Sequence, residues 1–203
     1  MWAKEKFCRI VLSKKIFLLL NFVLIYFLLT NNSSADLQKK IINKLTKTQT
    51  LSFEFTQVIA DKKEVGNCFI KYPLLMKCNY QNLKGKTIIS NGKTVAIIKR
   101  KYKKVYLYPI KSTPLFFILK KKSIIDLIEK IKPIETGSDL VEFVYIDKKK
   151  KIVKLLFNKS SLNLNGWKTK DAYSNNVSFK MNNIKVNNQI VDSFFIIPQE
   201  KDL

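Results

Sequence analysis

The sequence predicts a mainly β protein: roughly ten antiparallel strands, with one helix before them and two short helices inserted among them. Apolar and polar residues alternate along many segments, a period of two that is typical of strands with one buried face. Turn residues separate these segments. The 203-residue chain is 46% hydrophobic and 12% aromatic, which indicates a packed globular domain and excludes a disordered tail.

The first 35 residues have the pattern of an export signal. Basic residues 1–15 precede an apolar run from Ile16 to Leu29 and a polar tail ending in Ser33-Ser34-Ala35. The small residues at positions 33 and 35 suit signal peptidase, so we expect cleavage before Asp36. The run is shorter than the about 18 residues of a transmembrane helix, although an uncleaved anchor is the alternative. The expected domains are a cleaved signal peptide, 1–35, and one exported domain, 36–203.

The first element of that domain is an amphipathic helix over Asp36–Gln49. Its apolar residues recur at helical spacing, and Asp36 is the expected N-cap. These apolar residues are Leu37, Ile41, Ile42 and Leu45.

Strands follow the helix. The clearest alternating sets are Phe53 and Phe55; Val95 and Ile97; Val105 and Leu107; and Val141, Phe143 and Tyr145. The turns between strands are expected at Tyr72-Pro73, Lys84-Gly85, Asn91-Gly92, Asp147–Lys151, Asn163–Gly166, Asn175-Asn176 and Asn187-Asn188. Asn91-Gly92 predicts a tight hairpin, because both residues tolerate positive φ.

Two short helices are expected to interrupt the strands. Thr113-Pro114 opens the first, Leu115–Lys121, since proline suits a first helical turn. Ser123 is the expected N-cap of the second, Ser123–Lys132, with Asp126 at the capping-box position. Both are rich in large apolar side chains and must cover something apolar. They are either a lid over a cavity or a plug of ordinary core on one face of the sheet.

Three cysteines constrain the chain further. Cys8 lies before the apolar run, so it cannot be the lipidated cysteine that follows such a run in a lipoprotein. Cys68 and Cys78 flank the Tyr72-Pro73 turn and could face each other across two hairpin strands as a disulfide in an oxidising compartment. The alternative is two small buried apolar side chains.

The charge is +23, from 38 basic and 15 acidic residues, and +19 after residue 35, where 33 basic and 14 acidic residues remain. Only Arg9 and Arg100 are arginines, whereas nucleic-acid sites favour the guanidinium group, so we expect no nucleic-acid partner. The lysines reflect either a coding bias or an attraction to anionic membranes or acidic partners. The chain has no histidine, which excludes Ser-His-Asp catalysis and imidazole metal sites. With no phosphate loop or nucleophile motif, neither an enzyme nor a cofactor is expected.

Several short motifs follow one another along the chain. They are Phe53-Glu54-Phe55-Thr56-Gln57; Gly66 with Phe69-Ile70-Lys71-Tyr72-Pro73; Met76 to Tyr80; Ile88 to Lys93; Ser112-Thr113-Pro114-Leu115; and Gly166-Trp167, Asp171, Asn182-Asn183-Ile184, Asn187 and Phe194 to Pro198. In type and order they resemble the periplasmic outer-membrane lipoprotein carriers, the LolA family. The match covers nearly all of the chain after residue 35.

The resemblance implies an unclosed antiparallel β-barrel of about ten to eleven strands, wrapped around an N-terminal helix, with short lid helices over an apolar cavity. It implies a monomeric periplasmic carrier that takes acylated lipoproteins from an inner-membrane ABC-type transporter to an outer-membrane receptor. The expected cavity residues, chosen from the alternating faces, are Phe55, Phe69, Met76, Val95, Ile97, Leu107 and Phe143. The expected lid residues are Phe116, Phe117, Leu119, Ile124, Leu127 and Ile128.

Two positions depart from the family pattern. Tyr72 stands where the family usually has an arginine that latches the lid, and Cys78 replaces a tryptophan on the next strand. An envelope-stress regulator or lipid-sensing module with the same half-barrel, which binds but does not hand on its ligand, is the alternative function. A lipidated outer-membrane acceptor of the same fold is disfavoured, because no cysteine comes directly after the apolar run of the signal.

Overall fold

A computed structural model describes residues 32–81, 85–137, 139–146, 150–171 and 173–203. The basic and apolar parts of the expected signal, within residues 1–31, lie outside these ranges, as do parts of the turns expected at Lys84-Gly85 and Asp147–Lys151. Residues Gln38–Leu203 form one compact unit, which contains all of the strands.

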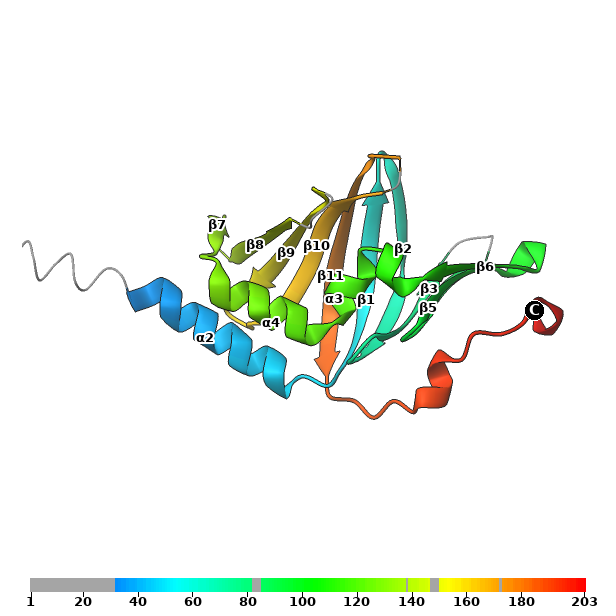
Figure 1. The fold of residues 1–203 in the computed structure, drawn as a ribbon, viewed down its shortest axis with the longest axis horizontal. Coiled ribbons are helices and arrows are strands. Elements are labelled where there is room, and N and C mark those ends of the chain that lie inside the picture. Colours follow the sequence, from blue (N-terminus) through cyan, green and yellow to red (C-terminus); the bar gives the residue numbers. More distant parts are fainter. Residues whose placement is uncertain (1–31, 82–84, 138, 147–149, 172) are drawn as a thin grey trace, which may run out of the picture. The chain divides into compact units, whose positions relative to one another are not determined.

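The described residues contain one antiparallel sheet of eleven strands in the order β6-β5-β4-β3-β2-β1-β11-β10-β9-β8-β7 (Figure 1). The strands are β1 (Thr50–Ile59), β2 (Lys62–Lys71), β3 (Leu75–Tyr80), β4 (Lys86–Asn91), β5 (Thr94–Lys99), β6 (Lys104–Pro109), β7 (Ile134–Thr136), β8 (Leu140–Ile146), β9 (Ile152–Asn158), β10 (Leu164–Lys170) and β11 (Asn176–Val186). Strands that follow one another in sequence are paired, except that β6 and β7 form the two edges of the sheet and β1 also pairs with β11. The prediction of an unclosed antiparallel sheet is confirmed.

Hairpin chemistry sets the register of these pairs. Ser90 lies opposite Val95, so the chain reverses at Asn91-Gly92, where Gly92 has φ +93°. The Asn91 side-chain oxygen accepts hydrogen bonds from the amides of Lys93 and Thr94, which closes the turn. The hairpin predicted from Asn91-Gly92 is therefore confirmed.

Helix boundaries differ from the sequence predictions. The N-terminal helix, α2 (Asn32–Lys47), begins before Asp36, so Asp36 is an interior residue and not an N-cap. Nothing between Asn32 and Ala35 ends a helix, since these residues include no glycine or proline. Its residues Ile41 and Leu45 are buried, whereas the lysines around them are mostly exposed.

The inserted helices, α3 (Leu115–Leu119) and α4 (Lys121–Lys130), lie between β6 and β7 in the chain. The break between them is at Lys120, with φ −91° and ψ 83°. Ser123 donates its backbone N–H to the Lys120 carbonyl, so it lies inside the first turn and is not the N-cap. Asp126 does not form a capping box but accepts a 3.1 Å hydrogen bond from Lys122 one turn earlier.

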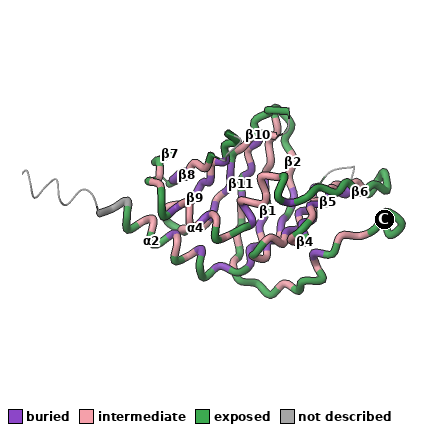
Figure 2. Tube along the Cα trace, viewed as in Figure 1, coloured by how far each residue is buried: buried purple, intermediate pink, exposed green. Residues whose placement is uncertain are grey.

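Buried residues alternate with more exposed ones along strands such as β2 and β3, whereas β6 and β7 have no buried residue (Figure 2). We call the face that carries Phe55, Cys78 and Phe143 the inner face. Helix α3 packs on this face, because the Phe117 and Tyr145 rings stack 3.9 Å apart at 5°. Helix α4 is held to α2 by Gln38, whose side-chain amide donates to the carbonyl oxygens of Ile128 and Ile131, both at 2.7 Å.

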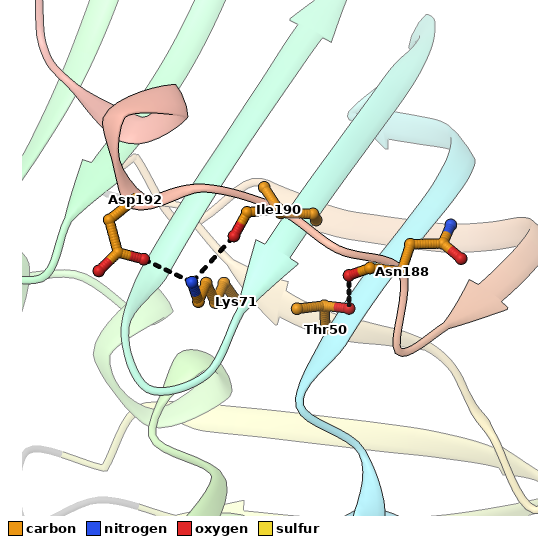
Figure 3. A network of polar contacts seen from close by, with 5 residues as sticks. All are labelled: Thr50, Lys71, Asn188, Ile190 and Asp192. Atoms are coloured by element: carbon orange, nitrogen blue, oxygen red, sulfur yellow. Dashed lines mark hydrogen bonds and ion pairs between the residues drawn. The ribbon is translucent and has the colours of Figure 1, made fainter.

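The C-terminal segment covers part of the outer face. Its short helices η3 (Asp192–Phe195) and η4 (Glu200–Asp202) follow β11, and Phe195 is 1% exposed in a cluster with Ile89, Ala96 and Ile98. Polar contacts attach the segment to the sheet (Figure 3). Lys71 Nζ lies 2.6 Å from the Asp192 carboxylate and donates to the Ile190 carbonyl, and the Thr50 hydroxyl donates to the Asn188 carbonyl.

Candidate functional site

A cavity of about 860 Å³ lies between the inner face of the sheet and the start of the inserted helical segment. Its volume is within the range of pockets that bury small organic ligands. The walls are mainly apolar. The apolar and aromatic sheet residues of the wall are Ile59, Met76, Cys78, Tyr80, Ile88, Val95, Ile97, Tyr108, Ile152, Trp167, Val177 and Phe179, and the helical segment supplies Pro114, Leu115 and Ile118.

Stacked aromatic rings form one wall of the cavity. The Trp167 and Phe179 rings are parallel within 7° at 4.1 Å, and Phe55 stacks behind Phe179 at 4.8 Å. Tyr80 meets Phe55 edge-on, also at 4.8 Å, and its hydroxyl donates a 2.6 Å hydrogen bond to the Gln57 side chain. Burial raises the pKa of Tyr80, and Glu64 adds to that rise, so this phenol is neutral. The wall is therefore apolar and uncharged.

Three of the seven expected cavity residues, Met76, Val95 and Ile97, line the cavity. Phe55 and Phe143 lie on the inner face but are 1% and 0% exposed, behind other side chains. Phe143 packs edge-on against Phe157. Phe55 therefore supports the wall through Phe179, whereas the partner of Phe143, Phe157, does not line the cavity.

Phe69 and Leu107 lie on the outer face, which corrects the sequence prediction. Phe69 pairs with Lys77 and packs edge-on against Phe194 of the C-terminal segment at 5.0 Å. Leu107 is opposite Ala96 and is 60% exposed, whereas the next residue, Tyr108, is opposite Val95 and lines the cavity. Because side chains alternate between faces, a choice that is wrong by one residue places the side chain on the opposite face.

The inserted helices touch the cavity through residues that the sequence prediction did not name. Leu115 and Ile118, one helical turn apart, line it together with Pro114. The six expected lid residues do not: Leu119, Ile124 and Ile128 are fully buried, Phe117 stacks on Tyr145, and Phe116 and Leu127 are half-buried. The missed signal is the spacing of three between Leu115 and Ile118.

Cys68 and Cys78 are direct cross-strand partners on β2 and β3 and are joined by a disulfide, with their Cα atoms 4.1 Å apart. Both side chains are buried on the inner face, and Cys78 lines the cavity. The bond links the two strands next to the turn that carries Tyr72. It therefore fixes part of the cavity wall.

The turn between β2 and β3 contacts the junction of α3 and α4. The Leu74 amide donates to the Leu119 carbonyl at 3.0 Å, and the Tyr72 amide donates to the Gln49 carbonyl at 2.9 Å. The Lys121 ammonium lies 5.8 Å from the centre of the Tyr72 ring. It also donates to the carbonyl oxygens of Thr48 at 2.9 Å and Thr46 at 3.1 Å, at the end of α2. The cation at this junction therefore comes from the inserted helix and not from position 72.

Within the part of the chain that the structure describes, no three His, Cys, Asp or Glu side chains gather as metal ligands. In the same ranges, no helix has both the length and the apolar character to cross a membrane. What the site provides is a mainly apolar volume beside a helical segment, and its charged lining residues are Lys150, Lys151, Lys170 and Asp171.

Comparison with known proteins places this geometry in context. The model of the family described as "Outer membrane lipoprotein carrier protein LolA" matches residues 46–198. None of the curated protein sequences matches the chain.

Solved structures of similar fold have little sequence in common with it. An uncharacterized conserved protein from Thermus thermophilus superposes with a TM-score of 0.50 at 10% identity, over 82% of this chain and 95% of the other. A LolA superfamily protein from Nitrosomonas europaea superposes with a TM-score of 0.43 at 9% identity, over 78% of this chain and 97% of the other. A DUF1329 family protein from Desulfovibrio piger superposes with a TM-score of 0.47 at 9% identity, over 81% of this chain and 96% of the other.

Proposed function

We propose that this chain, which belongs to the LolA family of outer membrane lipoprotein carrier proteins, shields the acyl chains of lipoproteins and carries them from the inner to the outer membrane. The observation that carries the proposal is the mainly apolar cavity of about 860 Å³ under a separate helical cover. Nothing in this proposal requires an enzyme activity, a nucleotide or a metal on the chain itself.

The physical need for such a cavity follows from the cargo. Each methylene of an acyl chain gains about 0.8 kcal/mol on leaving water, so an acylated protein does not cross an aqueous space unaided. The Trp167 and Phe179 rings and the aliphatic side chains of Ile88, Val95 and Ile97 offer an apolar surface for those chains. A neutral wall also avoids the cost of burying an unpaired polar group against the chains.

A carrier must also release its cargo, and the inserted helices provide a movable cover. The lid that we propose consists of α3 and α4, with Leu115 and Ile118 facing the cavity. The lid's apolar side chains and the acyl chains compete for the same sheet surface, so binding and opening are coupled. The other large apolar side chains of the lid hold it together or pack it on the sheet, beside the cavity and not inside it. They are Phe116, Phe117, Leu119, Ile124, Leu127 and Ile128.

The place of action that we propose is the periplasm, after removal of residues 1–35. The carrier, a monomer, accepts lipoproteins from an inner-membrane ABC-type transporter and delivers them to an outer-membrane receptor. Protein sequencing of the periplasmic form is expected to begin at or near Asp36. A membrane-bound form that retains Ile16–Leu29 would contradict this part of the proposal.

The test is purification of the protein from the envelope of a lipoprotein-producing Gram-negative cell, with mass spectrometry of acylated proteins that co-purify. A charge in the cavity, Ile97→Glu, is expected to abolish co-purification, whereas Ile146→Glu, at an exposed strand position outside the cavity, is expected to preserve it. Absence of acylated proteins from the folded wild type would contradict the proposal. Bound lipoprotein that is never passed to outer-membrane vesicles would favour the lipid-sensing module.

A further inference from the structure

The turn that joins β5 to β6 concentrates positive charge. Five of the six residues from Lys99 to Lys104 are basic, and the sixth is Tyr102. By comparison, 33 basic residues are spread over the 168 positions after residue 35. None of these six residues lines the cavity, so this surface is separate from the site described above. We call residues 99–104 the basic hairpin end.

A tight backbone turn holds these cations together. The short helix η1 (Arg100–Tyr102) follows β5, and Lys103, with φ +48°, donates its backbone N–H to the Arg100 carbonyl at 3.0 Å. The next residue, Lys104, begins β6. The turn projects from the sheet on the side of the C-terminus (Figure 1).

Lysines also face one another across the strands that lead into this turn. Lys99 is the direct partner of Lys104 on β6 and of Lys86 on β4. Like charges directly opposite each other destabilise a sheet. Two carboxylates reduce the repulsion, since Glu64 forms an ion pair with Lys86 and Glu200 lies 3.4 Å from Lys104. An anion from outside the chain would relieve the repulsion that remains.

Three cations of the basic hairpin end have no such carboxylate. Arg100, Lys101 and Lys103 are exposed, and none of them forms an ion pair with another described residue. The Arg100 amide donates to the carbonyl of Gly85, and residues 82–84, which precede Gly85 and lie outside the described ranges, include one lysine and no acid. The chain segment beside Arg100 therefore adds no counter-ion.

Glu200 offsets part of the charge. Its carboxylate accepts hydrogen bonds from the Val105 amide at 3.0 Å and from Lys104 Nζ at 3.4 Å. These contacts, the amide first, lower the pKa of Glu200, so it is ionised. Residues 200–203 carry two acids, one lysine and at most one terminal carboxylate, a net charge of −2 against the +5 of residues 99–104. A net charge of +3 therefore remains even when all of η4 is counted.

Tyr102 adds an amphipathic side chain to this charge. It is 52% exposed in the middle of the cations. Tyrosine is enriched at membrane interfaces, where its ring meets lipid and its hydroxyl meets water. Lysine side chains suit the same depth, because their stems lie along apolar surface while the ammonium groups stay in water. The combination matches the head-group layer of an anionic bilayer.

We propose that the basic hairpin end docks the protein on anionic phospholipid membranes, with Tyr102 among the head groups and Arg100, Lys101 and Lys103 against the phosphates. Each cation near such a surface strengthens binding by about fivefold. A nucleic acid would favour the arginine fork, and only one of the five cations is an arginine. This inference goes beyond the proposed function, because it concerns a surface outside the cavity.

The test is co-sedimentation with lipid vesicles of the protein purified without residues 1–35. Residues Gln38–Leu203 form one compact unit, so this form keeps the fold and lacks the apolar run Ile16–Leu29. It is expected to bind vesicles of phosphatidylcholine mixed equally with phosphatidylglycerol, and not vesicles of phosphatidylcholine alone. Binding is expected to weaken as the salt concentration rises. Equal binding to both kinds of vesicle overturns the inference.

Matched variants locate the docking surface. Lys101→Gln/Lys103→Gln is expected to lower partition into the mixed vesicles by at least about tenfold. The control, Lys180→Gln/Lys185→Gln, removes the same charge from two exposed positions of β11 and is expected to stay within about twofold of the wild type. Tyr102→Ala is expected to weaken binding by about threefold, whereas Tyr173→Ala, at a position that is 86% exposed, is expected to leave it unchanged.

The remaining outcomes separate other partners from a membrane. Equal losses in the two double variants would mean that net charge alone attracts the protein, which overturns the inference. Tighter binding to soluble poly-glutamate than to the mixed vesicles, with the same loss in Lys101→Gln/Lys103→Gln, would identify an acidic protein as the partner and overturn the membrane assignment. A fluorescent acyl probe is expected to bind this variant as it binds the wild type, so failure of the docking surface leaves the proposed function intact.

Discussion

The ammonium group of Lys121, at the start of α4, donates a 2.9 Å hydrogen bond to the carbonyl oxygen of Thr48, just beyond the end of α2. The last carbonyls of a helix have no partner within it and carry partial negative charge, which a lysine stabilises. Lys121 also contacts the Thr46 carbonyl and lies over the Tyr72 ring. One side chain therefore connects the inserted helices, the N-terminal helix and the turn between β2 and β3.

Replacement of Lys121 by methionine tests whether this contact holds the lid. The variant keeps most of the apolar stem of the side chain and loses the charge, so we expect a stability loss of about 1 kcal/mol, because Lys121 is half-buried and its bonds are partly screened. If the lid is released, an acyl probe will exchange faster in stopped-flow measurements. Lys122→Met is the control, since Lys122 is exposed and forms an ion pair within α4, with Asp126. Equal exchange rates in the two variants would contradict a latch.

The Tyr72 hydroxyl is buried and has no hydrogen-bond partner among the described residues. An unpaired buried hydroxyl costs about 1 to 3 kcal/mol, so Tyr72→Phe is expected to raise the melting temperature. Burial also raises the Tyr72 pKa above its ordinary value of 10.0. The folded state therefore keeps the proton that the unfolded state releases, and the wild type loses stability as the pH rises through 10.

The pH dependence separates this effect from a simple packing change. We expect the stability advantage of Tyr72→Phe over the wild type to grow between pH 8 and pH 11 in thermal unfolding followed by circular dichroism. Lysines titrate in the same range, but both proteins contain the same lysines, so the comparison cancels them. An advantage that stays constant with pH would indicate that the Tyr72 pKa is not raised.

The antiparallel succession of strands can be predicted because alternation and turn residues are local signals. Which side chains of a strand face the core is harder to predict where neighbouring residues are all apolar. Tyr106, Leu107 and Tyr108 are consecutive, and register with β5, not composition, places Tyr108 in the cavity. Similarly, the register of β2 with β3 places Phe69 on the outer face, where Phe194, distant in sequence, covers it.

The orientation of the inserted helix has the same origin. Residues Leu115–Leu119 are all apolar, so the helix has no polar face to orient it. Its position is set by tertiary contacts such as the stack of Phe117 on Tyr145. Two inserted helices could be predicted from this segment, but the face turned to the cavity could not.

The disulfide between Cys68 and Cys78 is expected to contribute about 2 to 3 kcal/mol, because it closes a short loop in the unfolded chain. Urea unfolding of the wild type with and without a reductant measures this contribution. The variant Cys68→Ala/Cys78→Ala is expected to match the reduced wild type and to be insensitive to the reductant. Two free thiols at Cys68 and Cys78 in the native protein, detected by mass spectrometry after alkylation, would contradict the bond.

Only glycine fits at position 66, because a side chain there would clash with its neighbours. A Cβ atom there would lie 2.0 Å from the Asn79 carbonyl oxygen and 2.8 Å from the Phe55 ring, which lies across the glycine. The backbone oxygen cannot move without disturbing the pairing of β2 and β3, so Gly66→Ala is expected to destabilise the protein by about 3 kcal/mol. The control is Asn67→Ala at the exposed neighbouring position, with little expected effect. Similar melting temperatures for the two variants would contradict this packing.

The final prediction separates a lid from a core plug. Leu115 lines the cavity and Phe116 does not, yet both are half-buried residues of the same short helix. A glutamate at either position costs the helix a similar packing loss, so the two variants are expected to melt within a few degrees of each other. Only Leu115→Glu places a charge against a bound acyl chain, where an unpaired charge is costly. We therefore expect Leu115→Glu to weaken binding of a fluorescent acyl probe by at least about tenfold, or 1.4 kcal/mol, while Phe116→Glu binds like the wild type. Equal binding by both folded variants would mean that α3 is a plug of the core, whereas selective loss in Leu115→Glu would identify its cavity-facing side as the surface that meets the acyl chain.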